Sequence, residues 1–163
     1  MAVSLNIKTN SKQVQKKFKR FQSVLPRVID KGVLQAGFQL VAIIREKTKK
    51  GIDFRDRPFA PYSEGYLKRL EKENRSTKVD LHYDGGMVGS LTPSMVKKTG
   101  KHKVSLGFAR ADERDKALFN QVLREPKREF FGFNNRTENI IRKQFNRFVA
   151  KELKKMKLWV YEK

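Results

Sequence analysis

The chain of 163 residues is long enough for one domain with a sizeable hydrophobic core, and it contains no cysteine. Disulfide bonds and thiolate metal sites are therefore excluded as sources of stability. The longest apolar run is far shorter than the ~20 residues that a membrane-spanning helix needs, and we find no secretion-signal pattern, so we expect a soluble protein with no membrane partner.

The formal net charge of +21 is concentrated toward the two ends of the chain. Residues 1–50 carry 12 basic and 2 acidic side chains, residues 51–100 carry 9 and 7, and residues 101–163 carry 17 and 8. A surface this basic attracts polyanions, so nucleic acid is the first partner that it suggests. An acidic protein surface would be attracted by the same field, and charge alone does not distinguish the two.

The first elements are a strand and a helix. Residues 3–9 alternate between apolar and polar side chains, which predicts a half-buried strand whose partner lies elsewhere in the sequence. Asn10 or Ser11 then caps a helix in which Val14 and Phe18 recur at helical spacing, followed by Phe21. We expect this helix to bury that stripe. Its outer face carries Lys12, Lys16, Lys17, Lys19 and Arg20.

A second, longer helix is predicted from Pro26 to about Lys49, because proline fits the first turn of a helix. Its principal apolar stripe consists of Ile29, Val33, Ala36, Leu40 and Ile43. So broad an apolar surface predicts the central core helix. Gly32 and Gly37 each cost it about 1 kcal/mol of helix propensity, which is tolerable if another backbone packs closely there. Gly51 is the natural terminator.

Residues 51–66 place three aromatic rings between two prolines, behind a leading glycine. These rings are Phe54, Phe59 and Tyr62. The pattern predicts an extended, turn-rich segment. From Ser63 to Asn74, apolar side chains recur at helical spacing, which predicts a short helix. The run over residues 71–78 has no apolar residue and no period, so we expect a solvated loop that can move.

Residues 80–84 read Asp-Leu-His-Tyr-Asp and lead into a glycine-rich turn over residues 85–91. On an extended chain, Asp80, His82 and Asp84 share one face and could ligate a cation or act as acid and base. No HExxH, GxSxG or phosphate-binding glycine loop accompanies them. A polar strand edge is the simpler interpretation, and we expect neither enzyme activity nor a cofactor.

In the last third of the chain, residues 95–98 and 103–108 flank a turn, which predicts a hairpin with Gly100 at positive φ. Residues 111–123 predict a short helix, and a final helix is expected to begin near residues 135–137. The side chains expected to face the core are Val104, Leu106 and Phe108 in the hairpin, and Ile140, Ile141, Phe145, Phe148, Val149 and Leu153 in the final helix.

Together these elements predict one domain over residues 1–163, with residues 157–163 as a C-terminal tail. The expected fold class is α+β, with an antiparallel sheet of about four strands packed against a long central helix and a C-terminal helix. The basic helices over residues 12–20 and 142–155 carry aromatic rings only on their apolar stripes, so we interpret their lysines and arginines as solvated faces.

The order of these motifs resembles the phage virion morphogenesis family, the small tail-completion and neck proteins of tailed bacteriophages. The matching positions are Gly51, Phe54, Pro61, Tyr62, Ser63, Tyr66, Leu81, Gly85 or Gly86, Met87, Ser90 and Leu91. Residues 104–107 resemble the family's following strand, residues 117–121 its next short helix, and residues 128–132 its aromatic-glycine element before the last helix. Two departures are Asn120, where the family often has histidine, and the lack of a glycine soon after Gln121.

The resemblance implies a structural virion protein, located in the tail or neck, that completes the tail end and helps to join the tail to the head connector. It implies no catalysis. The expected partners are other tail and neck proteins, such as the tail tube or terminator and the head connector, and further copies of this chain in a ring, assembled in the host cytoplasm. The alternative is a nucleic-acid-binding module that contacts DNA without sequence preference, and a third hypothesis is a metal-dependent hydrolase using Asp80, His82 and Asp84.

Two aromatic groups are the candidates for protein contacts, because aromatic and arginine side chains dominate interface energetics. They are Phe54, Phe59, Tyr62 and Tyr66 in the first group, and Arg128, Phe130, Phe131 and Phe133 in the second. Each group either covers the core or anchors a subunit contact, and the sequence leaves both interpretations open.

Overall fold

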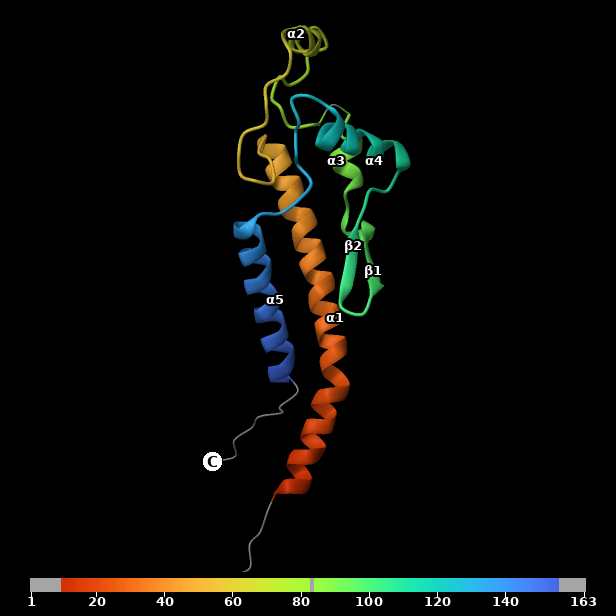
Figure 1. The fold of residues 1–163 in the computed structure, drawn as a ribbon, viewed down its shortest axis with the longest axis vertical. Coiled ribbons are helices and arrows are strands. Elements are labelled where there is room, and N and C mark those ends of the chain that lie inside the picture. Colours follow the sequence, from red (N-terminus) through yellow and green to blue (C-terminus); the bar gives the residue numbers. More distant parts are fainter. Residues whose placement is uncertain (1–9, 83, 156–163) are drawn as a thin grey trace, which may run out of the picture.

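The computed structural model describes residues 10–82 and 84–155, and it is built on one long helix. Helix α1 (Ser11–Lys50) has 40 residues and is therefore about 60 Å long. Helix α5 (Asn135–Lys155) packs along one side of α1, and a β-hairpin packs against another (Figure 1). The class is α+β, as predicted, with the long helix and the C-terminal helix both present.

The predicted break at Pro26 is wrong, since this residue lies inside α1. Proline removes one helical hydrogen bond, to the carbonyl of the residue four positions earlier. That residue, Gln22, is exposed, so water can satisfy the carbonyl. A second correction concerns the stripe at Val14 and Phe18, which was expected to be buried: these side chains are 53% and 55% exposed.

Glycines fix how other elements approach α1. A Cβ on Gly32 would lie 2.7 Å from the Phe145 ring of α5, and a Cβ on Gly37 would lie 2.5 Å from Val96 of the hairpin. Other elements therefore pack closely at both glycines, but the nearest atoms belong to side chains, so the expected close approach of a backbone is not observed. Gly51 ends α1 in the left-handed conformation, with φ of 79°, as predicted.

The hairpin consists of β1 (Val96–Gly100) and β2 (Lys103–Leu106), paired antiparallel. Positive φ occurs at His102 and not at Gly100. Asp30 of α1 accounts for this difference, because it accepts a hydrogen bond of 3.0 Å from the His102 backbone N–H and lies 2.9 Å from its ring Nδ1.

The expectation of about four strands is wrong for the described residues, which contain only this two-stranded sheet. The expected strand over residues 3–9 lies outside the described part of the chain. The polar strand edge expected at residues 80–84 is wrong at Leu81, whose φ of 55° is left-handed and not extended.

The remaining helices are short. α2 (Glu64–Lys72) is the short helix predicted from Ser63, and it stands apart at the top of Figure 1. Because α2 extends to Lys72, the solvated loop expected over residues 71–78 begins two residues later. The others are α3 (Gly86–Ser90), η1 (Pro93–Met95), α4 (Ala111–Leu118) and η2, a π-helical turn (Phe119–Leu123).

The core lies between the C-terminal half of α1, α3, β1, α4 and the chain segment before α5. Its fully buried members include Val41, Ile44, Leu91 and Phe130, and the hairpin residues Val104, Leu106 and Phe108 pack against them. Of the predicted inward residues of α5, Ile140 is exposed. No described helix combines the length and hydropathy needed to cross a membrane.

Candidate functional site

The two aromatic segments singled out in the sequence lie against each other at the C-terminal end of α1. The Phe54 backbone N–H donates a 3.0 Å hydrogen bond to the Glu129 carbonyl. Gly132 packs on the face of the Phe54 ring, where a Cβ would lie 2.9 Å from the nearest ring carbon. We call the paired residues 51–66 and 128–133 the aromatic junction.

Arg128 is the central residue of the aromatic junction and is 0% exposed. Its Nε and Nη2 donate hydrogen bonds of 3.1 and 2.8 Å to the carbonyl oxygens of Ala60 and Pro61. The guanidinium lies 4.9 Å from the centre of the Tyr62 ring, in cation–π geometry. Burial, followed by the nearby charge of Arg124, lowers the pKa of Arg128, but arginine starts so high that it remains charged. Carbonyl oxygens and a ring face therefore hold this cation.

A second cation, Lys47, ties the same region to both long helices. Its Nζ lies 2.7 Å from an Asp56 carboxylate oxygen and donates to Phe54 O and Thr137 Oγ1, at 3.3 and 3.2 Å. The Lys47 ammonium and then the Asn134 amide lower the pKa of Asp56. One side chain of α1 thus holds the loop after α1 and the first turn of α5.

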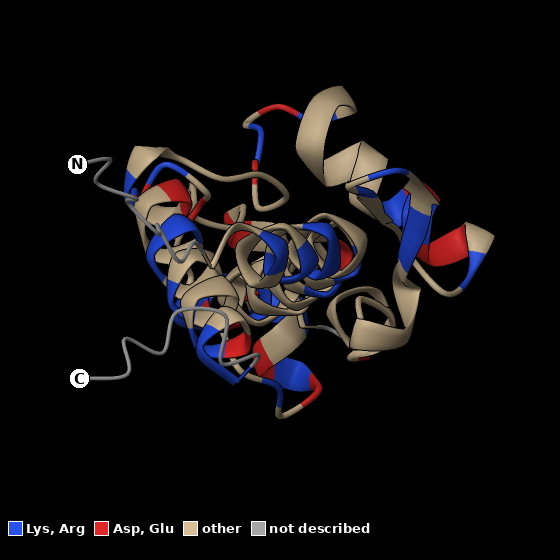
Figure 2. Cartoon of the chain, turned by 90° about the horizontal axis from the view of Figure 1, so that it is seen from below, with Lys and Arg blue, Asp and Glu red and all other residues tan. Residues whose placement is uncertain are grey.

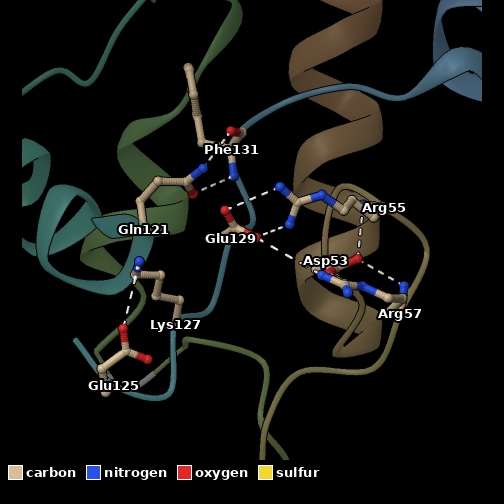
Figure 3. Close-up of polar contacts among 8 residues, drawn as sticks. All are labelled: Asp53, Arg55, Arg57, Gln121, Glu125, Lys127, Glu129 and Phe131. Atoms are coloured by element: carbon tan, nitrogen blue, oxygen red, sulfur yellow. Dashed lines mark hydrogen bonds and ion pairs between the residues drawn. The ribbon is translucent and has the colours of Figure 1, made fainter. Parts of the chain in front are cut away.

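The outer side of the aromatic junction is held by a carboxylate network (Figure 3). Asp53 accepts hydrogen bonds from the backbone N–H groups of Arg55 and Arg57, both at 2.8 Å, and from Arg57 Nε at 3.1 Å. Arg55 reaches across to pair with Glu129. Asp53 therefore shapes the loop locally, whereas Arg55 and Glu129 connect it to the distant segment.

Gln121 holds the other face of the second segment (Figure 3). Its amide donates to Phe131 O at 2.9 Å and accepts from Phe131 N–H at 3.0 Å, so it replaces a neighbouring strand. Sequence reasoning did not assign this role to Gln121 or the turn-forming role to Asp53. An Asp followed by a turn is a recognised local signal, whereas the long-range Gln121 contact has no local signal.

The structure divides the eight predicted interface residues by burial. Phe59, Arg128 and Phe130 are buried within the single chain, where their side chains complete the core. The side chains that remain accessible, partly or largely, are Phe54, Tyr62, Tyr66, Phe131 and Phe133. Phe133 is the most open of them, at 55% exposure.

Tyr62 and Tyr66 line a cavity of about 310 Å³ beside the aromatic junction. Their rings meet edge to face, with centroids 4.8 Å apart. Burial, followed by the neighbouring Tyr66 and Asp80, raises the pKa of Tyr62. The rest of the lining is mainly polar and includes Arg69, Asp84, Lys116, Asn120 and Arg124. Rings beside guanidinium and ammonium groups can accept an aromatic or acidic side chain of a partner protein.

The acidic and histidine residues at positions 80–84 act as loop-forming groups. Asp80 accepts a 3.0 Å hydrogen bond from the His82 backbone N–H, and Asp84 accepts one of 2.9 Å from Gly86. The Gly86 hydrogen bond is the first cause of the lowered pKa of Asp84, which also lies 3.5 Å from Lys116. Within residues 10–82 and 84–155, no group of three or more His, Cys, Asp or Glu side chains has the arrangement of a metal site.

Among the residues that the structure describes, lysines and arginines lie on several sides of the molecule, with acidic residues between them, and do not gather on one face (Figure 2). A nucleic-acid-binding surface commonly shows a basic patch or stripe. Comparison of the chain with protein-family models, with curated proteins and with solved structures gives no significant match.

Proposed function

We propose that this chain is a structural protein of a tailed-phage particle that completes the tail end or neck and helps to join the tail to the head connector. The observation that carries this proposal is the aromatic junction. Two of the motif segments that carry the family resemblance, residues 51–66 and 128–132, are distant in sequence but form one structural unit.

The charged groups near this unit support a scaffolding role. Lys47 and Glu129 each hold one segment to another, and Asp53 holds the turn within its own segment, at the contacts described above. A catalytic site needs a nucleophile, base or metal ligand that is positioned toward substrate. The charged groups of Lys47, Asp53 and Glu129 instead point toward the protein's own backbone and toward their salt-bridge partners.

The proposed partners are the tail tube or terminator, the head connector and further copies of the chain in a ring. Tyr62 and Tyr66 offer a cavity with aromatic and cationic walls, and Phe133 offers an exposed ring, so both are suited to protein contacts. The alternative, a nucleic-acid-binding module without sequence preference, is supported by the net charge of +21.

The role is tested by locating the protein in particles. An epitope-tagged chain is supplied to a phage whose own copy has been deleted, and particles are imaged with a gold-labelled antibody. The proposal predicts label at the junction of head and tail or at the tail end, and separate heads and tails when the chain is omitted. Normal infectious particles without the chain would overturn the proposal.

A matched pair of variants separates the structural role from the hydrolase hypothesis. Changing Asp80, His82 and Asp84 together to asparagine should leave joining intact, whereas changing Tyr62 and Tyr66 to alanine should reduce it. A metal-dependent hydrolytic activity that the triple variant abolishes would contradict the structural role.

A further inference from the structure

An apolar groove of about 470 Å³ runs along α1 between the hairpin and α5. Its floor is α1 from Val33 to Ile44. One wall is β2, through Val104 and Leu106, and the other is formed by Phe133 and Ile141. Apolar grooves of this size with an exposed aromatic ring on the rim are typical of surfaces that bind another protein segment.

The β2 wall has an unused hydrogen-bonding edge. Among the described residues, β2 pairs with β1 alone, so the backbone groups along its second edge have no strand partner. An exposed edge of this kind is a template for an added strand. Val104 packs toward α1 near Gly37, and side chains alternate along a strand, so Ser105 faces away from α1. A strand added here would place alternate side chains on the groove floor.

Residues 3–9 have the sequence that such a strand requires. Val3, Leu5 and Ile7 alternate with Ser4, Asn6 and Lys8. The apolar set would lie on α1 beside Val104 and Leu106, and the polar set would face solvent beside Ser105. These residues lie outside the described part of the chain.

The segment of the same chain cannot reach the groove. Val3 is seven residues before Asn10, which precedes α1, so an extended chain carries it at most about 25 Å along the helix. Val33, at the near end of the floor, lies about 34 Å along the helix from Asn10. Val3 therefore does not reach the groove of its own chain, and Leu5 and Ile7, which are closer to Asn10 in sequence, reach even less far. The first ten residues of α1, residues 11–20, are all exposed and form what we call the arm.

We propose that residues 3–9 of a second copy bind in this groove as a third strand on the free edge of β2. The arm of each copy then carries its strand to a neighbour, and the exposed Val14 and Phe18 are delivered to the same contact. The inference goes beyond the proposed role in particles, because it rests on the groove and the reach of the chain and holds for any role. Since each copy carries +21, the contact forms when salt screens the repulsion.

Single cysteines test the contact directly, because the native chain has none. One chain carries Asn6→Cys and a size tag, and an untagged chain carries Ser105→Cys. The two are mixed and oxidised at about 0.5 M salt, where the screening length is about 4 Å. A disulfide of mixed size is expected, since neighbouring strands place such pairs within bonding distance. Ser4→Cys is tested in parallel, because the register of the added strand sets which residue faces Ser105.

The matched control is Lys97→Cys, since Lys97 stands opposite Ser105 on β1 and shares its outward face. The proposal predicts that Ser105→Cys cross-links at least about tenfold faster than Lys97→Cys. Leu5→Asp in the chain that carries Asn6→Cys should remove this preference, whereas Lys8→Gln in the same chain should not. Equal rates, a preference for Lys97→Cys, or no mixed disulfide with either segment position would overturn the proposal. A cross-link confined to single chains carrying both cysteines would also overturn it. Particle localisation remains a separate test of the role.

Discussion

The two ends of α1 both carry apolar side chains at helical spacing, but their surroundings are opposite. Near its C-terminal end, Val41 and Ile44 are 1% and 2% exposed, because the hairpin, α3 and the aromatic junction cover them. In the arm, Val14 and Phe18 are more than half exposed. Helical spacing thus identifies an apolar stripe, but it does not say what covers the stripe. In an assembly protein, part of the cover can come from another chain.

The difference has an energetic consequence. Burying a Val or Phe side chain stabilises a protein by about 1.5–3 kcal/mol relative to leaving it in water. The packed end of α1 gains this within one chain, whereas the arm can gain it only through a further contact. The following variants test whether the contrast is as sharp as the structure indicates.

The largest effect is expected for Arg128→Ala in the aromatic junction. This change leaves the carbonyls of Ala60 and Pro61 without their donors and opens a cavity, so the free energy of unfolding should fall by about 3 kcal/mol. Urea unfolding followed by circular dichroism measures it. Arg147→Ala, on the exposed face of α5, is the control and should change stability by less than about 0.5 kcal/mol. Equal effects would show that Arg128 does not join the two segments.

Gly37→Ala should have the next largest effect. The added methyl group gains about 1 kcal/mol in helix propensity but meets Val96 at 2.5 Å, so we expect a net loss of about 1–2 kcal/mol as the hairpin is displaced. Gly65→Ala in α2 is the matched control, because no atom outside its neighbours lies within 4 Å, and it should stabilise slightly. Stabilisation by both changes would mean that the hairpin is not packed closely on α1.

A pH effect is expected where the hairpin meets α1. The hydrogen bond from Lys98, followed by that from the His102 backbone, lowers the pKa of Asp30 from 3.8 to about 2. Because the folded pKa lies below the unfolded one, this stabilisation is present above about pH 4 and is lost as the pH falls toward 2. Lys98→Ala should flatten the dependence of the melting temperature on pH in this window, while Lys97→Ala should leave it unchanged. If Lys97→Ala flattened the pH dependence more than Lys98→Ala, Asp30 would not be the residue that anchors the hairpin to α1.

The smallest effect on the monomer is expected for Phe18→Ser in the arm. The side chain is already exposed and the two residues have similar helix propensity, so the free energy of unfolding should change by less than about 0.5 kcal/mol. The same change should weaken self-association at high salt, which sedimentation at several concentrations measures. A loss of monomer stability comparable to that of Gly37→Ala would show that the arm is covered within its own chain.

Local patterns predicted much of the fold. The apolar periods placed the C-terminal half of α1 and the whole of α5, the spacing around residues 99–101 placed the hairpin, and Gly51 placed the end of α1. Pro26 led to the wrong prediction of a helix break. A proline inside a helix is tolerated where the carbonyl that loses its hydrogen bond is open to solvent, and the sequence does not reveal whether that carbonyl is exposed.

The aromatic junction could be predicted only in part. Its two segments were identified separately from their rings, but their pairing depends on contacts between residues more than sixty positions apart, such as Arg128 with Ala60. No local period encodes such a contact. For the same reason, the sequence did not show which aromatic and arginine side chains would be buried and which exposed. Buried are Phe59, Arg128 and Phe130, and exposed is Phe133. The role in a particle stays a prediction.

The most direct test of the central claim, that the arm is uncovered in the single chain and covered in the assembly, is amide hydrogen exchange along α1 at low and high salt. At low salt the account predicts rapid exchange for residues 14–20 and slow exchange for residues 34–48, because only the second range is held by tertiary packing. At high salt, where self-association is expected, residues 14–20 should become protected. Equal protection of both ranges in the monomer, or an arm that stays unprotected in an assembled complex, would contradict the account.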